Sequence, residues 1–168
     1  MDLNRILVPV SFAPSCKKAM RTAASLAAAF DAKLYVVSVY KTLPRLFYSV
    51  GGIFFPEDLK RERDERIKAL DEFVKKEMKL LRASVRVEEM HVEEEDPVDA
   101  ILRVANEKKV DLIVLGHHEE TKLEHFLFGK NIDRLVDKAP CDVIVTRTNL
   151  FKKKEAEARE EERAERVA

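Results

Sequence analysis

The residues best suited to chemistry lie in two glycine-containing segments late in the chain, Gly116–Glu119 and Gly129–Asn131. A glycine at the end of a strand lets the backbone approach a phosphate closely. A glycine that opens a helix leaves free N–H groups and a partial positive charge at the same place, and Lys130 adds a cation. The pattern predicts a phosphate-binding site; the alternative is that both glycines merely start and stop elements.

The spacing excludes a Walker P-loop. The residue five before Gly129 is Glu124 rather than glycine, and Lys130 is followed by Asn131 rather than by Ser or Thr. Any phosphate site here therefore belongs to another class.

The other reactive side chains predict neither a metal centre nor a catalytic centre. His117 and His118 are adjacent, so in extended backbone they point apart, and no further His or Cys set has metal-ligand spacing. We find no nucleophile elbow, no paired catalytic carboxylates and no Cys–His couple, and Glu93–Glu95 is a charge run of the kind that is usually solvated. The sequence favours binding over catalysis.

These segments lie in a chain that alternates strands with helices. Apolar, β-branched runs predict buried strands, and apolar residues at helical spacing predict the helices between them. The predicted strands are 5–10, 33–39, 84–92, 111–116 and 143–145, and the predicted helices are 15–30, 57–81, one from 97 and one from about 131 to Pro140. Strands separated in this way imply right-handed crossovers, so we predict an α/β fold: a five-stranded parallel sheet, doubly wound, with helices on both faces.

Such a sheet binds ligands at the carboxyl ends of its strands, where the strand order reverses. The loops after the first and fourth strands are therefore the places to search, and they contain Ser11 and Gly116.

Several local features are also expected. Ser15 and Asp96 are the predicted N-caps of their helices, and Pro97 follows Asp96 at the first helical position. The strand at 84–92 is polar, so we expect it at a sheet edge. The side chains predicted to face inward from two of the helices are Ala19, Ala23, Leu26, Ala27, Phe30, Ile132, Leu135 and Val136.

Composition fits one α/β domain over residues 1–150, followed by a charged tail over 151–168. Basic and acidic residues both number 31, so the zero net charge gives no electrostatic reason to expect nucleic acid or a membrane surface. Cys16 and Cys141 are far apart and are expected to be reduced, and we find neither a signal peptide nor a spanning segment, so we expect a cytoplasmic protein. Abundant Lys, Arg and Glu with few amides resembles a thermophile composition.

Three segments carry a family resemblance: RILVPVSFAPS at residues 5–15, DPVDA at 96–100, and the stretch 111–147 with DLIVLGHH, FLFGKN and KAPCDVIVTR. Together they resemble the universal stress protein family over residues 3–147. The resemblance implies a Rossmann-like fold of the adenine nucleotide alpha hydrolase kind and a stress-response binding module. It also implies ATP, with Mg²⁺, or another adenine nucleotide as ligand.

The nucleotide-binding members of that family carry G-x-x-G, nine residues, then G-S or G-T. Gly116 and Gly129 match the first and last glycines, but Glu119 replaces the middle glycine, Lys130 replaces the Ser or Thr, and Ser11 replaces an acidic residue. The carboxylate of Glu119 would repel phosphate, and Lys130 partly offsets it. The ligand-binding residues expected by this resemblance are Pro9, Ser11, Leu115, Gly116, His117, Gly129, Lys130 and Asn131.

The alternative is a dimeric interaction or protective protein that has lost the nucleotide. The resemblance implies a homodimer through the last strand, 143–147, and an apolar edge strand is itself unlikely to stay uncovered. The aromatic loop 43–55 is interpreted as a flap or a subunit contact, and the alternative is that it folds down as satellite core. Enzymatic activity would amount at most to weak ATP hydrolysis, for which His117, His118 or Glu119 would have to activate water.

Overall fold

The computed structural model describes residues 3–11, 14–40, 56–81, 84–93, 96–117 and 130–147. Several predictions concern residues outside these ranges: the aromatic loop 43–55, the tail 151–168, and the positions His118, Glu119 and Gly129. For those residues the predictions stand as made from the sequence.

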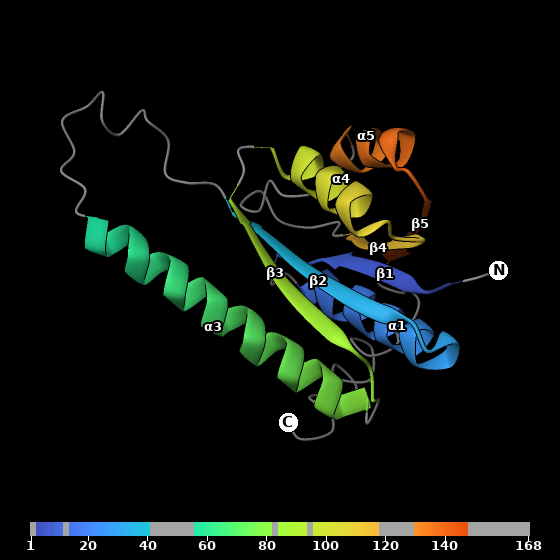
Figure 1. Ribbon diagram of the computed structural model, residues 1–168, viewed down its shortest axis with the longest axis horizontal. Coiled ribbons are helices and arrows are strands. Elements are labelled where there is room, and N and C mark those ends of the chain that lie inside the picture. Colours follow the sequence, from blue (N-terminus) through green and yellow to red (C-terminus); the bar gives the residue numbers. More distant parts are fainter. Residues whose placement is uncertain are drawn as a thin grey trace, which may run out of the picture.

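Nine elements alternate along the described part of the chain (Figure 1). They are β1 (Arg5–Pro9), α1 (Pro14–Phe30), β2 (Lys33–Tyr40), α3 (Pro56–Leu81), β3 (Val87–Glu93), α4 (Pro97–Lys108), β4 (Leu112–His117), α5 (Lys130–Lys138) and β5 (Asp142–Arg147). All neighbouring strands pair in parallel, in the order β3-β2-β1-β4-β5. The predicted five-stranded, doubly wound fold is confirmed, and the strand order reverses between β1 and β4.

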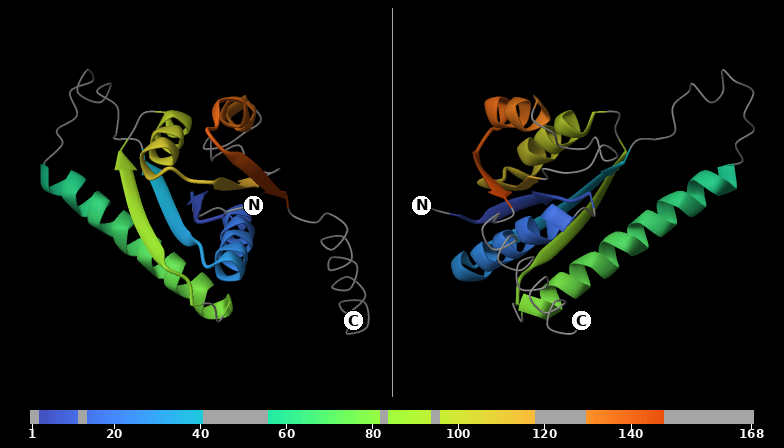
Figure 2. Two further views of the ribbon diagram at one scale, coloured as in Figure 1. Left: turned by 45° about the vertical axis from the view of Figure 1, so that its right-hand side comes forward. Right: turned by 180° about the vertical axis from the view of Figure 1, so that it is seen from behind.

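Two helices cover each face of the sheet, with α1 and α3 on one side and α4 and α5 on the other (Figures 1 and 2). Alternate strand residues supply the two cores, as the two-residue period of a strand requires. The strand residues of the α1–α3 side are Ile6, Val8, Leu34, Val36, Leu112 and Val114, and those of the α4–α5 side are Leu7, Tyr35, Val37, Val39, Ile113 and Leu115.

The alanine face of α1 packs as predicted, with Ala19, Ala23 and Ala27 buried. Small side chains let this helix approach the sheet closely. The helix begins at Pro14, so Ser15 lies within its first turn and the prediction that Ser15 is the N-cap is wrong. Phe30 is also 48% exposed, because it is the last residue of the helix, where the chain leaves for β2.

The N-cap predicted for α4 is confirmed. Asp96 has extended backbone, and its Oδ1 accepts hydrogen bonds from the N–H groups of Val98 at 2.8 Å and Asp99 at 3.2 Å. Those groups are among the four that a helix start leaves without intrahelical partners. The carboxylate thereby fixes where α4 begins.

The sheet edges are β3 and β5. The polar strand is at an edge, as predicted. At the other edge Ile144 is 39% exposed, and Val136 on α5 is 48% exposed, so the prediction that Val136 is buried is wrong. None of the helices in the described part of the chain is both long and apolar enough to cross a membrane.

Candidate functional site

The candidate site is the carboxyl edge of the sheet between β1 and β4. Both strands are described in full, and their ladder consists of two pairs, Ile6 with Leu112 and Leu7 with Ile113. In contrast, β1 pairs with β2 along its whole length, and β4 pairs with β5 as far as His117 and Arg147. Beyond Leu7 and Ile113, therefore, β1 pairs with β2 and β4 pairs with β5, but β1 and β4 do not pair with each other.

The same two strands are tied firmly at their amino ends by Asp111. Its Oδ2 accepts hydrogen bonds from the N–H groups of Asn4 and Arg5, each at 2.9 Å, and its own N–H donates to the carbonyl of Arg5 at 2.9 Å. Because β1 and β4 are joined at their amino ends and do not pair at their carboxyl ends, the switch point is open toward the carboxyl edge. Ligands bind at this edge in sheets of this kind.

The first wall of the site is the end of β1. The N–H of Ser11 donates to Cys16 Sγ at 3.3 Å, and the Ser11 hydroxyl lies 3.5 Å from the same sulfur. Cys16 is buried in the first turns of α1 and is a free thiol. The bonds to sulfur hold the start of the β1–α1 connection against the helix. Ser11 is thus placed by a cysteine for which the sequence predicted only the reduced state.

The second wall is the end of β4. Gly116 is buried, and the carbonyl of Leu115 accepts a hydrogen bond at 2.9 Å from the buried hydroxyl of Thr146 on β5. The Leu115 side chain is fully buried in the core beneath α4 and α5, so it can face a ligand only through its backbone.

His117 is the unusual residue of this wall. Its Nδ1 is buried, and among the described residues it has no hydrogen-bond partner. Buried nitrogen atoms in native proteins are nearly always paired, so such an atom calls for an explanation.

Next to this wall, the α1 side chain of Lys18 donates to the backbone carbonyl of Arg147 at the end of β5. The ammonium of Lys18 therefore lies at the carboxyl edge, at the end of β5. A cation at this edge suits an anionic ligand.

The third wall is the start of α5. The helix begins at Lys130, whose side chain is not described, and Asn131 is half-buried in the first turn. Arg134, one turn further on, donates from Nη1 to Asp96 Oδ2 at 2.6 Å and from Nη2 to Asp99 Oδ1.

Arg134 thus joins α5 to the N-terminus of α4. The Arg134 hydrogen bond lowers the pKa of Asp96, and the two carboxylates raise the pKa of Arg134. The sequence analysis did not predict this contact. The signal that could have found it is the pair Asp96 and Asp99 at the start of α4, once α5 is placed on the same face of the sheet.

Of the predicted ligand-binding residues, the fold brings Pro9, Ser11, Leu115, Gly116, His117 and Asn131 to one edge of the sheet. Gly129 and the side chain of Lys130 lie outside the described residues. Within the described ranges no group of three His, Cys, Asp or Glu side chains could hold a metal ion.

Cys141 offers no reactive group. Burial is the main cause that raises the pKa of its thiol to about 11, and the nearby carboxylates of Asp142 and Asp111 add to the effect. The thiolate is the reactive form of cysteine, so this residue is inert at neutral pH.

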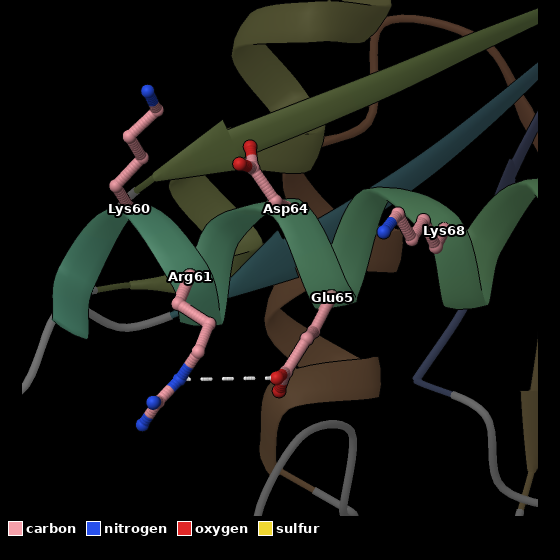
Figure 3. Close-up of a pocket in the computed structure, with 5 residues that line it drawn as sticks. All are labelled: Lys60, Arg61, Asp64, Glu65 and Lys68. Carbon is pink, nitrogen blue, oxygen red and sulfur yellow. Dashed lines mark ion pairs between the residues drawn. The ribbon is translucent and has the colours of Figure 1, made fainter. Parts of the chain in front are cut away.

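A depression of about 320 Å³ on α3 is not a second candidate (Figure 3). The described residues that line it come from successive turns of one helix: Lys60, Arg61, Asp64, Glu65 and Lys68. Arg61 and Glu65 lie 4.0 Å apart there, with side chains 74% and 70% exposed. Such a pair is a solvated helix surface of the kind that contributes little energy.

Comparison with known proteins gives a consistent result. Residues 3–147 match the universal stress protein family. A universal stress protein of Methanocaldococcus jannaschii is 30% identical over 146 residues, which cover 86% of this chain and 82% of that protein.

Solved structures with this fold include two that hold ligands. A universal stress protein in complex with cAMP has a TM-score of 0.66 at 22% identity, covering 89% of this chain and 100% of that one. The universal stress protein from Archaeoglobus fulgidus in complex with dAMP has a TM-score of 0.58 at 23% identity, covering 86% of this chain and 98% of that one. At these identities the likeness confirms the fold.

Proposed function

The chain belongs to the universal stress protein family, and from that premise we propose that it is a binding module for an adenine nucleotide. The nucleotide would lie at the carboxyl edge between β1 and β4, with its phosphate toward the start of α5. We propose ATP with Mg²⁺ as the first ligand to test, and AMP as the second.

The observation that carries the proposal is the unpartnered, buried Nδ1 of His117 beside the buried Gly116. A buried polar atom without a partner costs about 1–3 kcal/mol, and a ligand hydroxyl, an amino group or a water held by a ligand would remove that cost. Its position at the switch point is where ligands bind in doubly wound sheets.

Two features support the ligand class, one from related structures and one from this chain. The solved structures with cAMP and dAMP both hold an adenine nucleoside bearing one phosphate group. In this chain the start of α5 offers N–H groups without intrahelical partners, which suit a phosphate.

The departures of this sequence from the family motif set the preference that we expect among AMP, ADP and ATP. Glu119 adds a negative charge to the loop, and repulsion grows with the number of phosphates. Comparison of AMP, ADP and ATP therefore tests whether Lys130 and Mg²⁺ compensate for that charge.

The test is calorimetric titration of nucleotide-stripped protein with AMP, ADP and Mg-ATP. We expect micromolar binding that is lost in Gly129→Trp, which fills the space a phosphate would need, and weakened in His117→Phe, which removes the ring nitrogen. Lys68→Ala on the exposed face of α3 is the control and should bind normally. Absence of heat at millimolar nucleotide would overturn the proposal.

A second candidate function is a protective or interaction protein that works as a homodimer without nucleotide. It is favoured by the edge position of β5, with Ile144 39% exposed on it, because an open edge strand can pair with another chain. Sedimentation equilibrium tests it: a dimer that Ile144→Glu converts to monomer would support pairing through β5, and a monomeric wild type would contradict it.

A further inference from the structure

We propose that Arg134 is a positioning residue, which clamps the start of α5 to the N-terminus of α4 and so holds the first-turn N–H groups of α5 in place for an anionic ligand. This inference rests on the proposed nucleotide function. It assigns a role to a side chain outside the set of predicted ligand-binding residues.

The clamp joins two helices through both ends of one guanidinium. Nη1 of Arg134 donates to Asp96 at 2.6 Å, and Nη2 donates to Asp99. Asp96 is itself fixed, because its other oxygen accepts the backbone N–H groups of Val98 and Asp99. The planar fork of arginine thereby meets two acceptors whose own positions α4 determines.

Apolar packing alone is a weak constraint on α5. The helix has nine residues, and its buried apolar side chains are Ile132 and Leu135, whereas Val136 is 48% exposed. Helices this short depend on tertiary contacts for their stability. A charged contact at a defined point therefore limits how the helix can slide or rotate on α4.

The clamp is close to the groups that it would position. Arg134 follows Lys130 by four residues, which is a rise of about 6 Å along the helix axis. The first-turn N–H groups lie between these two residues and have no intrahelical acceptors. A tilt of α5 at Arg134 would move them directly.

The competing interpretation is an ordinary surface ion pair without consequence for binding. The Arg134 side chain is 31% exposed and those of Asp96 and Asp99 are 39% and 60% exposed, so such a pair could contribute little stability. Stability measurements alone cannot separate the two interpretations, and ligand affinity can.

The chain offers a matched control in Glu88. This carboxylate bridges two cations, Lys33 at 2.5 Å and Lys108 at 2.8 Å, as Arg134 bridges two carboxylates. Its exposure, 34%, is close to that of Arg134, but it lies at the amino edge of the sheet, where β2 and β3 begin. Glu88→Gln therefore removes an equivalent network away from the site.

The experiment measures Mg-ATP affinity, melting temperature and backbone hydrogen exchange for wild type, Arg134→Gln, Arg134→Lys and Glu88→Gln. We expect Arg134→Gln to weaken binding roughly fivefold and to speed exchange at residues 134–136, whose amides donate to the first-turn carbonyls of 130–132. Arg134→Lys should be intermediate, because an ammonium lacks the two-pronged geometry. Glu88→Gln should lower the melting temperature by about as much as Arg134→Gln does, and it should leave the affinity and the exchange of 134–136 unchanged.

Unchanged exchange at 134–136 in Arg134→Gln would overturn the clamp, whether or not nucleotide binds. Faster exchange with unchanged affinity would overturn its role in positioning the ligand site. If wild type binds no nucleotide, the proposed function fails and the ligand role fails with it, whereas the exchange data still decide whether Arg134 orders α5.

Discussion

Replacing Arg21 with methionine should destabilise the protein, because it leaves the buried Glu77 carboxylate without the cation that faces it. The Arg21 Nε donates to Glu77 Oε2 at 2.7 Å, and this pair joins α1 to α3. The two side chains differ in burial: that of Glu77 is 1% exposed and that of Arg21 is 49% exposed.

The magnitude follows from that asymmetry. Breaking a fully buried ion pair costs about 3–5 kcal/mol, because an uncompensated charge remains away from water. Water reaches half of Arg21 and can partly replace it, so we expect about 2 kcal/mol. For a chain of this size that loss corresponds to a fall of roughly 4–8 °C in the melting temperature.

Chemical denaturation of three variants tests the reasoning. Arg21→Met should be the least stable, and Glu77→Met should cost less than about 1 kcal/mol, because the arginine left behind is half in water. The double variant should recover most of the loss, since an apolar pair suits a buried helix interface. A double variant as unstable as Arg21→Met, or a single Arg21→Met loss under about 0.5 kcal/mol, would refute the account.

Three further predictions concern charge, thiol chemistry and backbone conformation. Because Arg134 lowers the pKa of Asp96, the charged carboxylate stabilises the fold above the unfolded pKa of about 3.9, and this contribution is lost as the pH falls through the folded pKa. Asp96→Asn should therefore be less stable than wild type by about 1 kcal/mol at pH 7, and the difference should shrink as the pH falls below about 3.9, as urea denaturation across pH will show. Cys141, with a thiol pKa near 11, should react with iodoacetamide at pH 8 orders of magnitude more slowly in folded protein than in urea, and equal rates would contradict its burial. Lys109 caps α4 in the left-handed conformation, at φ 50° and ψ 54°, which glycine adopts without strain. Lys109→Gly should therefore raise the free energy of unfolding by about 0.5–1 kcal/mol. In the same thermal melts the control Lys76→Gly, on the exposed face of α3, should lower it by a similar amount.

Much of the fold could be predicted because its signals are local. Apolar runs and helical spacing were enough to predict five strands and the helices between them, and the alternation then required a parallel, doubly wound sheet. The same topology predicts that Ser11 and Gly116 meet at one edge, since parallel strands end together. The errors at Ser15, Phe30 and Val136 all fall at helix ends or on a short helix, where a periodic pattern has too few residues to define a face.

Five predictions concern binding, assembly, location, activity or residues that the structure does not describe. The homodimer, the role of Mg²⁺, the cytoplasmic location, any weak ATP hydrolysis and the 151–168 tail stay predictions from the sequence and the family resemblance. Glu119 and Gly129 lie in the loop that the family resemblance predicts to contact a nucleotide, so titration with nucleotide is the direct test of those positions.

The sequence by itself determined the order of elements, the parallel sheet and the edge at which a ligand would bind, because hydrophobic period and N-cap residues act over a few positions. Only the tertiary structure decided that β1 and β4 part beyond Leu7 and Ile113, that Cys16 holds Ser11, and that Arg134 joins α5 to α4. These contacts link residues from different elements. They depend on which helix lies beside which and at what rotation, and that is set by the packing of the whole core rather than by any local pattern.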